Sequence, residues 1–170
     1  GGGSSMDCAK AVGACIARPR TPLMKMKGIL KVLRPLPPLF AVPTTAGTGS
    51  ETTLAAVITD AKTRVKYPVN DFPLIPKYAV LDPEVTRSLP PFITASTGLD
   101  ALTHAVEAYI GRSTTKKTRK AALKAVGLIF GNLQNAFHDG NNMTARKNML
   151  HASYYAGVAC TISYVGYVHA

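Results

Sequence analysis

A helix is predicted for the segment Thr97-Gly-Leu-Asp-Ala-Leu-Thr-His-Ala-Val-Glu-Ala-Tyr109, which carries an acid and an imidazole four residues apart. On a helix this spacing places Asp100 and His104 on one face, with Glu107 a further turn along. A carboxylate beside a neutral imidazole supplies half of a site for a divalent metal such as Fe(II) or Zn(II). An isolated pair of this kind is more often a buried histidine satisfied by a nearby acid, because two ligands do not hold a metal.

The hydrophobic pattern changes character near residue 89. Upstream it predicts a helix over 5–17, a buried parallel strand over 39–42, a hairpin of 54–59 with 65–69, and a strand over 78–81. Downstream it predicts three helices, over 97–111, 115–137 and 143–160. We therefore expect an α/β unit over residues 1–88 followed by an all-α unit over residues 89–170. In the first helix the apolar face is expected to contain Met6, Ala9, Val12, Gly13 and Ile16.

Two glycine-rich segments have the composition of phosphate-binding loops. The chain opens with Gly1-Gly-Gly-Ser-Ser-Met-Asp-Cys-Ala-Lys10, in which a glycine turn runs into a helix. Glycines before a helix bring backbone N–H groups and the positive end of the helix dipole close to an anion. The second segment is Pro43-Thr-Thr-Ala-Gly-Thr-Gly-Ser-Glu51, which offers four hydroxyl groups directly after a strand. Taken alone, each segment is also compatible with a linker or a plain polar turn.

Together the three segments resemble the iron-containing (group III, metal-dependent) alcohol dehydrogenase family. Its hallmarks are a GGGS-x-x-D turn, a PTTAGTGSE loop, a D-P…P…G-x-D-A-x-x-H-x-x-E segment and a later G-x-x-H-A. The third hallmark appears here as Asp82-Pro83…Pro90…Gly98-Leu-Asp100-Ala-Leu-Thr-His104-Ala-Val-Glu107, and the fourth as Gly166-Tyr-Val-His169-Ala170. The order of all four motifs matches, from the first residue of the chain to the last.

The resemblance implies a dehydroquinate synthase-like fold and NAD- or NADP-dependent oxidation of a small alcohol to its aldehyde. It implies metal ligands at Asp100, His104 and His169, with Fe(II) or Zn(II) as the metal and a fourth ligand that relatives carry in a P-H-G pattern. Hydride transfer is then metal-assisted and uses no side-chain nucleophile. The cofactor contacts that the resemblance implies are Gly2, Gly3, Ser4, Thr44, Thr45, Thr48, Ser50 and Lys66. His138 and His151 match no ligand position.

Several alternatives remain open at this stage. Within the same fold, a zinc-dependent glycerol dehydrogenase-like enzyme or a dehydroquinate synthase-like enzyme fits the motifs. In another class, the net charge of +11 suggests a basic fragment that binds nucleic acid. Arg112, Lys116, Lys120 and Lys124 repeat every four residues and must face solvent or an acidic partner. No recognition motif accompanies this charge, so nucleic-acid binding is not expected.

The remaining expectations concern the protein as a whole. The motifs that relatives carry before Gly1 and after Ala170 lead us to expect an internal piece of a larger enzyme, inactive by itself, whose parent forms homo-oligomers. With 46% hydrophobic residues and no apolar run long enough to span a bilayer, we expect a cytoplasmic protein without a membrane partner. Cys8, Cys15 and Cys160 are expected to be buried, reduced thiols.

Overall fold

The computed structural model of the chain describes residues 1–163. Its first part contains one long helix, α1 (Gly3–Ala17), two short 3-10 helices, η1 (Leu23–Met26) and η2 (Phe72–Leu74), and five strands. The strands are β1 (Gly28–Ile29), β2 (Phe40–Ala41), β3 (Ala55–Thr59), β4 (Lys66–Asn70) and β5 (Tyr78–Ala79). A last 3-10 helix, η3 (Pro83–Thr86), leads into the second part, which is helical: α2 (Pro91–Ile110), α3 (Lys116–His138) and α4 (Met143–Ser163). The predicted change from α/β to all-α structure is therefore observed.

The strands form two small sheets. In one, β3 pairs antiparallel with β4, with Val57 opposite Pro68, and β1 adds parallel to the other side of β4. This is the predicted hairpin, closed by a turn in which the Asp60 carboxylate accepts the backbone N–H groups of Lys62 and Thr63. In the other sheet, β2 and β5 run parallel. The predicted parallel pairing is confirmed for Phe40–Ala41, but the prediction of a buried strand over 39–42 was wrong. Only Ala41 is buried among these strand residues, because Phe40 is 62% and Val42 37% exposed.

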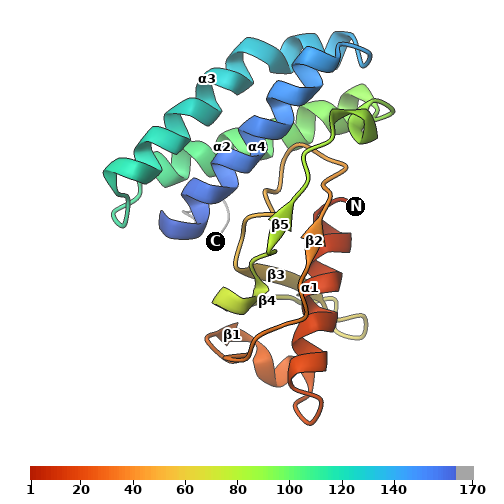
Figure 1. Cartoon of the computed structure of the whole chain (residues 1–170), viewed down its shortest axis with the longest axis vertical. Coiled ribbons are helices and arrows are strands. Elements are labelled where there is room, and N and C mark those ends of the chain that lie inside the picture. The colour runs from red at the N-terminus through yellow and green to blue at the C-terminus, as the bar shows by residue number, and fades with distance from the viewer. Residues whose placement is uncertain (164–170) are drawn as a thin grey trace.

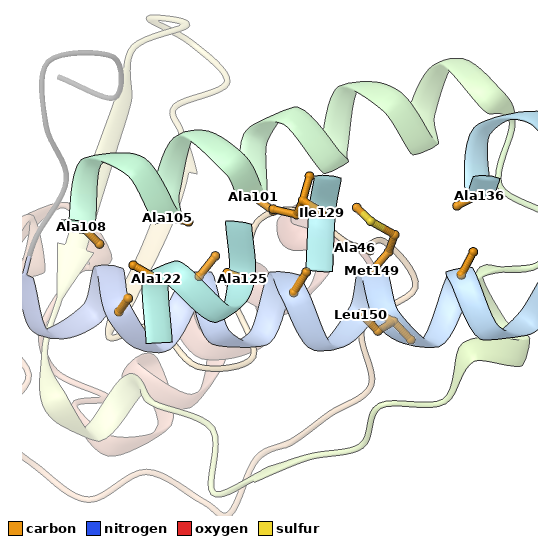
Figure 2. Close-up of a cluster of buried hydrophobic side chains, with 14 residues drawn as sticks. Ala46, Ala101, Ala105, Ala108, Ala122, Ala125, Ile129, Ala136, Met149 and Leu150 are labelled. Carbon is orange, nitrogen blue, oxygen red and sulfur yellow. The ribbon is translucent and has the colours of Figure 1, made fainter. Parts of the chain in front are cut away.

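The three long helices pack side by side at one end of the molecule, with the sheets and α1 at the other (Figure 1). Their shared core consists mainly of alanines from all three helices, together with Ile129, Met149 and Leu150 (Figure 2). Because alanine side chains are short, the helix backbones can approach closely. Ala46, from the loop after β2, belongs to the same cluster. None of the described helices is long and apolar enough to cross a membrane.

The helix boundaries follow local signals. α2 begins six residues earlier than predicted, because Pro91 occupies its first position, where the missing N–H has no cost. α3 begins with a capping box, in which Thr115 and Thr118 satisfy each other's backbone N–H groups. It ends at His138, and a basic side chain in the last turn interacts favourably with the negative end of the helix dipole. The basic stripe of Arg112, Lys116, Lys120 and Lys124 is exposed, as expected.

The buried face of α1 differs from the predicted one. Met6 is buried as expected, but Val12 and Ile16 are 53% and 60% exposed. The buried positions are instead Met6, Lys10, Ala11 and Ala14. The prediction was wrong because a lysine occupies a core position, where it finds three oxygen acceptors. Because this different face of α1 is buried, Cys8 and Cys15 are exposed. Of the three cysteines, only Cys160 fulfils the expectation of a buried thiol.

Arg146 fixes the segment that joins the two parts. Its side chain is 3% exposed. It donates to the carbonyl oxygens of Arg87, Leu89 and Gly140, and to Thr94 Oγ1 at 2.7 Å. The planar guanidinium can reach all four acceptors, which a lysine cannot do. The end of η3 and the first turn of α2 are thereby tied to the first turn of α4.

Replacing Arg146 with methionine should destabilise the chain strongly. The substitution keeps an apolar stem but leaves buried acceptors without a donor, at about 1–3 kcal/mol for each unsatisfied group. Arg112→Met is the matched control, because Arg112 is exposed on the turn after α2 and its loss should change stability by less than about 0.5 kcal/mol. Urea unfolding of the two variants measures the difference. Equal unfolding midpoints would contradict the role given to Arg146.

Candidate active site

The two glycine-rich segments meet in the structure, although about forty residues separate them in sequence. We refer to residues 43–53 as the threonine loop. The Gly1 amino group donates to Val42 O at 2.8 Å, and Thr44 N donates to Gly1 O at 3.1 Å. A Cβ atom on Gly3 would lie 2.8 Å from Thr48 Cγ2, so a larger residue there would displace the Thr48 side chain. The first turn of α1 therefore packs directly against the threonine loop (Figure 1).

This junction presents hydrogen-bonding groups to an incoming ligand. Gly2 caps α1 without a side-chain hydrogen bond, and the first turn holds no acidic residue. The leading N–H groups of such a helix have no partner within the helix, and they carry the positive end of its dipole. Thr45 Oγ1, 3.6 Å from the position of a Gly2 Cβ, is buried and has no hydrogen-bond partner among residues 1–163. The arrangement fits an anionic group such as a phosphate.

The threonine loop also contacts the helices that form the second part. Gly47 lies against α2, where an added Cβ would come within 2.6 Å of Thr97 Cβ and Thr97 O. Gly49, at φ +61°, meets Gly157 of α4 so closely that an added Cβ would lie 2.8 Å from its Cα. Thr161 Oγ1 donates to Thr52 O at 3.1 Å. The loop is therefore held between α1 on one side and α2 and α4 on the other.

The two predicted metal ligands of α2 lie near this contact. Asp100 and His104 are half-buried. Asp100 lies about one helical turn after Thr97, the residue that Gly47 contacts. Cys160 of α4 faces the same helix. Burial, and then the charges of Glu107 and Asp100, raise the pKa of the Cys160 thiol to about 12. The threonine loop thus contacts both α1 and α2, the helix that carries the acid–imidazole pair.

The donor set that residues 1–163 provide is chemically suited to a divalent metal but incomplete. Asp100 and His104 offer one carboxylate and one imidazole four residues apart on a helix, a combination that suits Fe(II) or Zn(II). Within the described range, no group of three or more His, Cys, Asp or Glu side chains is placed to hold a metal ion. The third predicted ligand, His169, lies outside the described residues.

Other predicted site residues take different positions. Ser4 is exposed in the first turn of α1. Ser50 is 4% exposed, and its hydroxyl donates to Asp7 Oδ1 at 2.7 Å, so it binds the loop to α1. Lys66 is exposed at the start of β4, opposite Thr59, and the contacts that join α1 to the loop do not include it. His151 is half-buried on α4, where burial, and then Lys147 and Lys124, lower its pKa.

Sequence comparison identifies the family of the chain. Residues 1–83 match the family described as "Iron-containing alcohol dehydrogenase", and residues 94–170 match its C-terminal part, described as "Fe-containing alcohol dehydrogenase family, C-terminal". The chain belongs to the iron-containing alcohol dehydrogenase family. It is 45% identical, over its whole length, to 1,3-propanediol dehydrogenase of Citrobacter freundii. It is 44% identical over 169 residues to the NAD-dependent methanol dehydrogenase of Bacillus methanolicus.

Solved structures of the family share the fold. A crystal structure of 1,3-propanediol oxidoreductase matches with a TM-score of 0.95 and 43% identity, over 99% of this chain and 44% of that one. An alcohol dehydrogenase from Oenococcus oeni matches with a TM-score of 0.94 and 40% identity, over the same shares. The predicted α/β plus all-α, dehydroquinate synthase-like fold is confirmed. The chain spans less than half of the length of the relatives it matches.

The three cysteines should differ sharply in reactivity within this family fold. Cys8 and Cys15 are exposed on α1, whereas Cys160 is 7% exposed with its thiol pKa raised to about 12. Only the thiolate is alkylated, so at pH 8 the folded chain should react quickly at Cys8 and Cys15 and slowly at Cys160. Timed iodoacetamide labelling and peptide mass spectrometry measure the three rates. Equal rates at Cys160 and Cys15 before unfolding would contradict the placement of Cys160 beside α2.

Proposed function

We propose that residues 1–170 supply the cofactor loop and part of the metal site of an NAD(P)-dependent, metal-dependent alcohol dehydrogenase. The single observation that supports this most is the contact of three separate segments: the start of α1, the threonine loop and the α2 helix that carries Asp100 and His104. We also propose a boundary at residues 88 and 89 between the cofactor-binding and metal-binding parts. The name of the Bacillus methanolicus relative favours NAD as the cofactor.

The cofactor would bind where the glycines allow close approach. In this proposal, the N–H groups of Gly2, Gly3 and Ser4 hold the pyrophosphate at the positive end of α1. Thr44, Thr45 and Thr48 contribute hydroxyl groups to the phosphates and ribose, and the unsatisfied Thr45 Oγ1 supports this role. Ser50 and Lys66 complete the proposed set, Ser50 by supporting the loop through Asp7 and Lys66 from the β3–β4 hairpin.

The metal would be held by Asp100, His104 and His169, with Fe(II) or Zn(II) equally suited to these donors. Such an ion lowers the pKa of a bound alcohol, which makes hydride loss to nicotinamide easier. The chain's own residues would position the two parts of the site. Gly47 packs the threonine loop against Thr97, one helical turn before Asp100, and the alanine core packs α2 against α3 and α4. Substrates are then small alcohols and their aldehydes.

A chimera tests the proposal directly. Residues 1–170 replace the aligned segment of the NAD-dependent methanol dehydrogenase of Bacillus methanolicus, which supplies the remaining length of a complete enzyme. We expect the chimera to contain metal and to reduce NAD when methanol is added. A folded chimera that binds neither metal nor NAD would exclude the proposed function.

In the chimera, Thr45→Ala should weaken NAD binding by about 1–2 kcal/mol, for the loss of one hydroxyl contact. Metal content should not change, because the loop and the metal helix are separate parts of the site. Thr63→Ala is the matched control, because Thr63 lies exposed in the β3–β4 turn. Calorimetric titration with NAD and elemental analysis measure both quantities. If Thr45→Ala and Thr63→Ala bind NAD equally, the hydroxyl of Thr45 has no role in the cofactor site.

A further inference from the structure

Lys10 is fully buried, yet each N–H of its ammonium group donates a hydrogen bond. The side chain lies on α1 with 0% exposure. Its Nζ donates to Thr53 O at 2.8 Å, to Thr53 Oγ1 at 3.1 Å and to Ala55 O at 2.9 Å. These three acceptors lie at the end of the threonine loop and the start of β3. An ammonium group has three donors, so its hydrogen-bonding capacity is met in full.

Asp7, one turn earlier on the same face of α1, holds the neighbouring residues of the same segment. Its Oδ1 accepts from Ser50 Oγ at 2.7 Å, and its Oδ2 accepts from the backbone N–H of Val57 at 3.0 Å. Asp7 and Lys10 together therefore hold the chain from Ser50 to Val57 against α1. The other end of the loop is held by the backbone bond between Thr44 and Gly1.

The charges around Lys10 are arranged to balance it. Burial lowers the pKa of Lys10 to about 8, against the opposing effect of the negative charges of Asp7 and Glu51. Glu51 is 2% exposed, and its two carboxyl oxygens accept no hydrogen bond from another residue within 1–163. Burial raises the pKa of Glu51, while a hydrogen bond from its own backbone N–H, and then the Lys10 charge, oppose that rise. Burying an ammonium group costs several kcal/mol, and an apolar side chain would fill the same space without that cost.

We propose that Lys10 is a positioning residue for cofactor binding, which fixes the threonine loop against α1 so that Thr45 and Thr48 stay beside the N-terminus of that helix. The inference rests on the proposed function of this loop. Lys10 itself lies seven residues after Gly3, about 10 Å along the helix axis, so it acts through the loop and not on the cofactor. It should affect cofactor affinity much more than the chemical step.

The test is Lys10→Met in the methanol dehydrogenase chimera. Methionine fills the space of the lysine stem but offers no donor to Thr53 and Ala55. We expect the KM for NAD to rise about tenfold or more, with kcat within about threefold and metal content unchanged. Lys62→Met is the matched control, because Lys62 is exposed in the β3–β4 turn and should leave both constants unchanged.

A pH profile separates positioning from a general loss of stability. The groups whose charges act on Lys10 are Asp7 of its own helix and Glu51 of the loop. As the pH rises through about 8, the ammonium loses one of its three donors, so the KM for NAD should rise. This rise should be absent in Lys10→Met, which has no proton to lose at this position.

A second measurement needs no host enzyme. In the 170-residue chain, Lys10→Met should speed hydrogen–deuterium exchange between Ser50 and Val57 and leave α3 unchanged. Faster exchange there, with the KM effect in the chimera, supports the inference. Unchanged exchange, or a Lys10→Met chimera with the NAD affinity of the unsubstituted one, overturns it. If the unsubstituted chimera binds no NAD at all, the proposed function fails instead.

Discussion

Replacing Asp100 or His104 with alanine in the chimera should remove metal and turnover together. Both side chains project from one face of α2, and a metal that loses one of its few protein ligands binds far more weakly. Changes in the groups that merely support a ligand already cost 10–100-fold, so loss of a ligand should cost at least about a hundredfold in metal affinity or activity. Elemental analysis and initial rates of NAD reduction measure the two losses.

His138→Ala is the matched control for the imidazole. His138 is exposed at the end of α3 and contacts only the Phe137 ring among the described aromatic groups. It should leave metal content and rate unchanged. Full metal occupancy with a normal rate in either Asp100→Ala or His104→Ala would remove the metal-site interpretation, whatever the NAD affinity of the variant.

Gly157→Ala should have the second largest effect, through the position of the threonine loop. An added Cβ would lie 2.3 Å from Thr52 Oγ1 and 2.9 Å from both Gly49 Cα and Gly49 O. The Thr52 side chain could rotate, but the Gly49 backbone cannot move without shifting the loop. Overpacking of this kind costs about 1–3 kcal/mol, and the displaced loop should also bind NAD less tightly.

Gly131→Ala provides the control on a neighbouring helix. Gly131 lies on an exposed face of α3, and a Cβ atom added there meets nothing within 4 Å. Alanine should stabilise that helix by about 0.5–1 kcal/mol. Thermal unfolding of both chimera variants should therefore give midpoints shifted in opposite directions. A Gly157→Ala midpoint equal to that of the unsubstituted chimera would show that α4 does not restrain the loop.

Much of the fold could be predicted because its signals are local. The hairpin of β3 and β4, the parallel strand β2 and the three long helices each follow from periodicity and turn residues within their own segments. The start of α2 was misplaced because proline at the first helical position resembles a helix breaker in sequence. The candidate metal and cofactor residues were predicted from separate motifs and from the family that these motifs resemble.

The contacts between segments could not be predicted in the same way. Lys10 reads as a solvent-facing residue of an amphipathic helix, and only the structure shows that Thr53 and Ala55 provide its three acceptors. The rotation of α1 that follows also exposes Cys8 and Cys15. The GGGS-x-x-D motif contains Asp7, but nothing in the spacing of the motif indicates a bond to Ser50. Nothing in the sequence around Gly157 predicted its close contact with the threonine loop, because the contact is with Gly49, over one hundred residues away.

The most direct test of the account is a crystal structure of the chimera with NAD, with anomalous scattering used to locate the metal. We expect an anomalous peak bonded to an oxygen of the Asp100 carboxylate and a nitrogen of the His104 imidazole. The NAD pyrophosphate should lie against Gly2 and Gly3, within hydrogen-bonding distance of Thr45 Oγ1. A metal bound elsewhere, or a pyrophosphate away from both α1 and the threonine loop, would contradict the account.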